Sequence, residues 1–149
     1  MHKVAVFLGR FFIGSLFVFS GLSKMFDWQN AEKSFVSALG DWHALSYPFL
    51  QNFFSALLPW ATAILTIVCA IEVVGGFFVI LGVKTRFFGL LLLLVLLPMT
   101  LLLHPFWFFE GSREEMQLTL FMKNIGVLGG LFYILAFGSE VLGGSDFEG

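Results

Sequence analysis

The chain has 149 residues, of which 58% are hydrophobic and only 12% charged, with a formal net charge of -2 and a mean hydropathy of +0.93. A water-soluble domain is about a quarter charged, so this composition excludes a soluble globular protein. No run of basic residues is present, which excludes nucleic acid as a partner. The single cysteine, Cys69, excludes an intrachain disulfide and a CxxC motif. The sequence predicts an integral membrane protein.

The first predicted element is a transmembrane helix over about residues 4–25, "VAVFLGRFFIGSLFVFSGLSKM". About 20 apolar residues suffice to cross the hydrocarbon layer as a helix. Arg10 interrupts the apolar run and no A-x-A cleavage pattern follows it. We therefore expect a retained first span rather than a cleaved signal peptide.

The long connection that follows contains "AEKSFVSALGDW" and "PFLQNFFSALLP", both with apolar residues at helical spacing. This pattern predicts two short helices lying in the membrane interface. A second span is expected over about residues 60–81, and a third over about residues 87–104. Only "GVKTR" joins these two spans, so they must be antiparallel neighbours.

A fourth span is predicted over about residues 118–137, followed by a flexible acidic tail at residues 138–149. Within this span, Gly126 and Gly130 form a GxxxG pattern that permits close helix contact. The whole chain is thus expected to form one all-α domain, a four-transmembrane-helix bundle with short interfacial helices in the first loop.

Polar and small residues lie on one side of each predicted helix. Residues at i, i+4, i+7 and i+11 share a face, and in the first span this face carries both Arg10 and Lys24. In the second span the corresponding face carries Glu72. Counting from the same end of the bundle, the depths of Arg10 and Glu72 agree to about 5 Å. The sequence therefore predicts a buried Arg10–Glu72 ion pair.

A second group of polar residues is expected near the opposite membrane face. Lys24 and His104 lie toward the ends of their spans there, whereas Lys123 and Asn124 lie near the expected start of the fourth span. A helix N-terminus adds N–H donors and partial positive charge. With no intramembrane acid assigned to this group, it predicts a cationic pocket for a small organic anion or another polar ligand.

Several stretches resemble the DoxX family of small four-helix bacterial membrane proteins. They are "GRFFIGSLFVFSGLSKMFD", "IEVVGGFFVILGVKTR", "LLLHPFW" and "FMKNIGVLGGLFYILAFG". The resemblance implies a four-helix bundle in the bacterial cytoplasmic membrane. Some members are associated with thiosulfate:quinone oxidoreductase as its small subunit, so the resemblance also implies a link to quinone chemistry.

Three functions remain open from the sequence. The first is a membrane component of a quinone-linked oxidoreductase system, with the quinone near Lys24, His104 and Lys123. The second is a non-catalytic scaffold that anchors soluble partners. The third is a carrier for a small solute. No metal site and no intrinsic cofactor is predicted, so electrons would come from a soluble redox partner or another donor. Association of two or more copies is also compatible with the sequence.

The orientation in the membrane is expected from the positive charges near each face. Lys3, Lys84 and Arg86 lie at one face, against Lys33 and Arg113 at the other. This difference favours a cytoplasmic location for both termini.

Overall fold

The computed structural model describes residues 2–137, in which all the regular secondary structure is helical. The elements are α1 (His2–Phe26), α2 (Trp28–Leu45), α3 (Pro48–Leu57), the short 3-10 helix η1 (Leu58–Trp60), α4 (Ala61–Leu81), α5 (Thr85–Leu103), a second 3-10 helix, η2 (Phe106–Phe108), and α6 (Ser112–Phe137). Four stretches, containing α1, α3–α4, α5 and α6, are long and apolar enough to cross a membrane. The predicted all-α membrane bundle is confirmed; the predicted tail lies outside the described residues.

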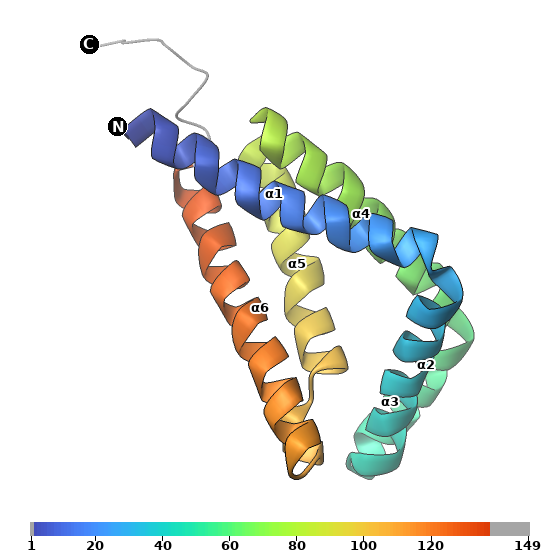
Figure 1. Cartoon of the computed structure of the whole chain (residues 1–149). Helices are drawn as coiled ribbons and strands as arrows, with labels where there is room; N and C mark the ends of the chain where they lie inside the picture. The colour runs from blue at the N-terminus through green and yellow to red at the C-terminus, as the bar shows by residue number, and fades with distance from the viewer. Residues whose placement is uncertain (1, 138–149) are drawn as a thin grey trace.

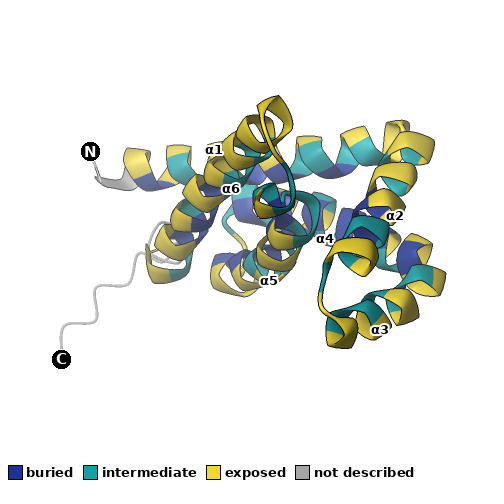
Figure 2. Ribbon diagram, turned by 90° about the horizontal axis from the view of Figure 1, so that it is seen from below, coloured by how far each residue is buried: buried dark blue, intermediate teal, exposed yellow. Residues whose placement is uncertain are grey.

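The helices are arranged in pairs. α1 packs along α4, α5 packs along α6, and α2 with α3 forms a hairpin that continues from the far ends of α1 and α4 (Figure 1). Phe17, Val79, Leu92 and Leu131 form the central core where the four long helices meet. The buried parts of the helices face one another in Figure 2. Large apolar side chains such as Phe12 and Phe19 are 65% and 72% exposed. Exposed apolar side chains of this kind are expected to face the lipid of the bilayer.

The α1–α4 contact is close because glycines meet at the crossing. A Cβ atom placed on Gly14 would lie 2.6 Å from the carbonyl oxygen of Gly76, and one on Gly76 would lie 2.6 Å from that of Gly14. Small residues let two membrane helices approach until their backbones touch. This contact fixes how far α1 is shifted along α4.

The α4–α5 connection is a tight turn, as its length predicts. Gly82 follows α4 with φ 77°, the left-handed conformation that ends many helices, and its N–H bonds back to the last turn. α5 then runs antiparallel to α4, through Pro98 without a break, and ends at Leu103 before the Pro105 ring.

α6 begins at Ser112, six residues before the predicted start at residue 118. Glu114 and Glu115 lie in its first turn, where carboxylates interact favourably with the helix dipole. Lys123 therefore lies about three turns into the helix. The expectation that the N–H groups of a helix start surround Lys123 and Asn124 is wrong.

The first loop forms a helical hairpin of 18 residues in α2 and 10 in α3. α2 is thus longer than the short helix predicted. Phe35 and Leu39 are buried, and the indole N–H of Trp42 donates to the Leu102 carbonyl at 3.1 Å. Leu102 is in the last turn of α5, where carbonyls have no intrahelical partner. Trp42 therefore attaches the hairpin to the end of α5.

Replacing Trp42 with phenylalanine should loosen this attachment. The variant keeps an aromatic ring and loses the hydrogen bond to the Leu102 carbonyl, so we expect unfolding to become easier by about 1 kcal/mol. Amide hydrogen exchange of α2 peptides in detergent should also accelerate. Trp60→Phe is the matched control, because Trp60 is 65% exposed; equal exchange in the two variants would contradict the assignment.

Candidate ligand site

A cavity of about 510 Å³ lies among the four long helices, and we call it the inner cavity. Its size is within the range of small-molecule sites, about 300–1,000 Å³. Each long helix supplies a polar side chain: Lys24 from α1, Glu72 from α4, His104 at the end of α5, and Lys123 with Asn124 from α6. The four candidate ligand residues from the sequence thus line one space.

An ion pair forms one wall of the inner cavity. Lys24 Nζ lies 2.7 Å from Oε1 and 2.5 Å from Oε2 of Glu72, and it also donates to Ser20 Oγ at 2.9 Å. The two charged side chains are only 22% and 7% exposed. An intramembrane charge is costly unless it is paired, so Lys24 and Glu72 stabilise each other in the bundle.

The structure therefore gives Glu72 a different partner from the predicted Arg10. α1 and α4 are antiparallel, with Gly14 against Gly76 and Gly21 against Cys69 and Glu72. Helical side chains lean toward the N-terminus of their own helix, which brings Lys24 and Glu72 together and directs Arg10 away from Glu72.

The depths of Arg10 and Glu72 expected from the sequence are wrong because α1 is shifted along α4. Ten residues of α1 separate Arg10 from the level of Ser20 and Gly21, a distance of about 15 Å. The N-terminal part of α1 extends beyond the end of α4 in Figure 1, so depths counted from a shared face do not correspond. Arg10 is nonetheless buried, at 3% exposure, and Glu72 at 5%, so both turn away from lipid as expected.

The inner cavity is not purely cationic, in contrast to the sequence analysis. It contains one carboxylate, Glu72, beside the two lysines, and the amide of Asn124. His104 Nδ1 lies 2.8 Å from Gln117 Oε1, so a neighbouring side chain orients the ring. The site offers both hydrogen-bond donors and a strong acceptor.

The sequence analysis missed two residues of this arrangement, Ser20 and Gln117. It also missed that Glu72 lines the ligand cavity, because it assigned Glu72 to an ion pair with Arg10. Ser20 was detectable, because it precedes Lys24 by four residues and lies on the same helix face. Gln117 lay outside the predicted fourth span, so no periodic pattern connected it with His104.

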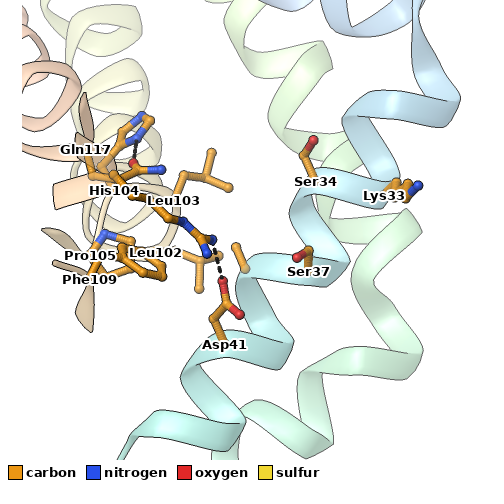
Figure 3. A pocket seen from close by; sticks show the side chains of 12 residues that line it. Lys33, Ser34, Ser37, Asp41, Leu102, Leu103, His104, Pro105, Phe109 and Gln117 are labelled. Carbon is orange, nitrogen blue, oxygen red and sulfur yellow. Dashed lines mark hydrogen bonds and ion pairs between the residues drawn. The ribbon is translucent and has the colours of Figure 1, made fainter. Parts of the chain in front are cut away.

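A second, more polar space opens beside His104 between α2 and the start of α6, and we call it the outer cleft. Its volume is about 460 Å³, and His104 and Leu103 line both this cleft and the inner cavity. Asp41 reaches from α2 to Arg113 of α6 at 3.6 Å, whereas the Lys33 side chain turns away from His104 (Figure 3). The Arg113 guanidinium also lies over the Phe109 ring, 3.8 Å from its centre. The outer cleft is therefore a polar space that adjoins the inner cavity on the side of the α2–α3 hairpin.

Metal binding receives no support from the described part of the chain, where no three His, Cys, Asp or Glu side chains gather. Cys69 is buried in a core cluster with Phe35, Leu39 and Leu65. Its surroundings are those of a small packing residue.

The four spans and the charged cavity among them define a multi-pass α-helical membrane protein with an internal polar site. The family model DoxX matches residues 5–105, which include α2, α3 and the first three spans. The chain belongs to the DoxX family. No curated protein and no solved structure matches it. The matched residues end before α6, so Lys123 and Asn124 lie outside the match.

Proposed function

We propose that the protein is a membrane component of a quinone-linked oxidoreductase system and that the inner cavity binds the quinone headgroup. The observation that supports this proposal most directly is the meeting of Lys24, Glu72 and Lys123 with His104 and Asn124 in one cavity between membrane-spanning helices, at which Lys123 remains exposed. A ligand that reaches such a site from the bilayer must dissolve in lipid and still carry polar atoms.

The donors and the acceptor suit both redox forms of a quinone. Quinone carbonyl oxygens accept hydrogen bonds, which Lys123 and Asn124 can donate. Hydroquinone hydroxyls donate, and the Glu72 carboxylate can accept. Reduction adds two electrons and two protons, one proton to each carbonyl oxygen. In this proposal a soluble partner protein supplies the electrons, and the polar side chains of the cavity relay protons.

We also propose a bacterial cytoplasmic membrane location with both termini on the cytoplasmic side. Lys84 in the α4–α5 turn and Arg86 in the first turn of α5 lie at the same end of the bundle as the N-terminus of α1. Short loops on the cytoplasmic side of a membrane carry an excess of Lys and Arg, which supports this orientation.

Replacing Lys123 with glutamine should weaken quinone binding about tenfold or more, the effect of losing one charged hydrogen bond. Affinity would be measured from quenching of tryptophan fluorescence by decylubiquinone and by a naphthoquinone analogue, with protein in nanodiscs of synthetic phospholipid. Lys84→Gln is the matched control, since Lys84 is exposed like Lys123 but lies in the α4–α5 turn, outside the lining of the inner cavity.

The same preparations would be analysed for small molecules that co-purify from the native membrane. A quinone retained by the wild type and the Lys84 variant, and lost from the Lys123 variant, supports the proposal. If neither ring type binds and only phospholipid co-purifies, the quinone function is wrong and the protein is better explained as a scaffold.

A further inference from the structure

A third space adjoins the site and is almost entirely apolar. This apolar groove, of about 590 Å³, lies among the α2–α3 hairpin, α4 and the C-terminal half of α5. Its walls are leucine, valine, isoleucine, phenylalanine, methionine and proline side chains, with Trp42 as the one lining residue that has a polar group. That indole N–H is already bonded to the Leu102 carbonyl. The groove therefore suits a hydrocarbon chain without polar substituents.

The groove adjoins the polar spaces at the last turns of α5. Met99 lines both the apolar groove and the inner cavity, and Leu102 lines both the groove and the outer cleft. Residues three apart share a helix face, so this face of α5 lies where a charged chamber meets an apolar one. A single molecule that fills both spaces must have a polar head and an apolar chain.

We propose that the ligand is a long-chain amphiphile whose head occupies the inner cavity while its chain lies in the apolar groove. This inference rests on the proposed function, under which the ligand is a quinone with an isoprenoid or alkyl chain. The α2–α3 hairpin is then the element that selects the chain, and α5 lines both the head site and the chain site.

Lipid dissolves such a chain as well as the groove does, so burial from water alone cannot produce selectivity. Close packing is the source of affinity between apolar groups within a bilayer. The hairpin side supplies rigid rings for such packing: Phe54 lies 5.1 Å from Trp42 and 5.3 Å from Phe53, measured between ring centres. Selection should therefore depend on the shape of the groove and be lost when the groove is filled.

The test compares two quinones that share a ring, decylubiquinone and the same ring with a methyl group in place of the decyl chain. Affinities would be measured in nanodiscs and expressed per mole fraction in the bilayer, which removes the effect of partitioning. The wild type should bind the decyl compound about tenfold more tightly, which corresponds to about 1.4 kcal/mol.

Val95→Trp is designed to fill the groove from α5, because Val95 lines it and is half-buried. We expect this variant to bind both quinones with the affinity that the wild type has for the methyl compound. Leu97→Trp is the matched control on the same helix, since Leu97 is 47% exposed and lies outside the lining of the groove; it should keep the tenfold preference.

The outcomes separate the two proposals. Equal affinity of the wild type for the two compounds, or a preference unchanged by Val95→Trp, overturns the chain site and leaves the head site intact. Failure of both compounds to bind the wild type overturns the head site and the chain site together. If Val95→Trp does not fold, the comparison on the wild type alone decides the inference.

Discussion

Replacing Glu72 with glutamine should lower the free energy of unfolding by about 3–5 kcal/mol, the cost of breaking a buried ion pair on one side. The reason is that Lys24 would remain inside the bundle, 22% exposed, without a carboxylate to balance its charge. Unfolding by sodium dodecyl sulfate in mixed micelles, without quinone, measures this loss.

A double-mutant cycle identifies the partner. Lys24→Met combined with Glu72→Gln should recover most of the lost stability, because no uncompensated charge remains at this position. Arg10→Met combined with Glu72→Gln is the control, and its two effects should add. Recovery of stability by the Arg10 change would contradict the pairing in the structure.

Alanine at Gly14 or Gly76 should be the second large effect, lowering stability by about 3 kcal/mol, the upper end for overpacking. The new methyl group would lie 2.6 Å from a carbonyl oxygen of the facing helix. A backbone atom cannot turn aside as a side chain does, so α1 and α4 would have to separate. The same unfolding assay would detect this loss.

Gly9→Ala and Gly126→Ala are matched controls on α1 and α6, because a Cβ atom at either position meets nothing within 4 Å. Alanine is a better helix former than glycine, so both should be neutral or stabilising by about 0.5–1 kcal/mol. A stability loss at the controls as large as at Gly14 would show that the crossing is not the cause.

The two glycines of the predicted GxxxG pattern behave differently. A Cβ atom on Gly130 would lie 2.7 Å from the Ile13 side chain of α1, whereas Gly126 has open space. The spacing alone identified a face of α6 and could not say which of its positions touches a neighbour. That depends on the angle at which α6 crosses α1.

Some features of the α2–α3 hairpin could likewise be predicted from the sequence, and others could not. Helical spacing identified helices in the first loop, because apolar periodicity is a property of each segment. Their lengths, the attachment of Trp42 to Leu102 and the apolar groove depend on where α2–α3 meets α5, and no local pattern encodes that meeting.

The early start of α6 was also missed, since hydropathy does not mark the polar first turns of a helix. The polar side of α6, which carries Lys123 and Gly126, is exposed, and Leu128 and Leu131 face inward instead, so the expectation of an inward polar side is wrong for α6.

By itself, the sequence determined that this protein lies in a membrane, its four spans, the antiparallel α4–α5 turn and the inward-facing sides of α1 and α4. These features follow from composition and from the 3.6-residue period, which act within one segment. The tertiary structure decided which charges meet. The glycine contact between α1 and α4 sets their relative shift, which places Lys24 rather than Arg10 beside Glu72. Such a contact depends on the fit of two surfaces, and a helix pattern describes only one of them.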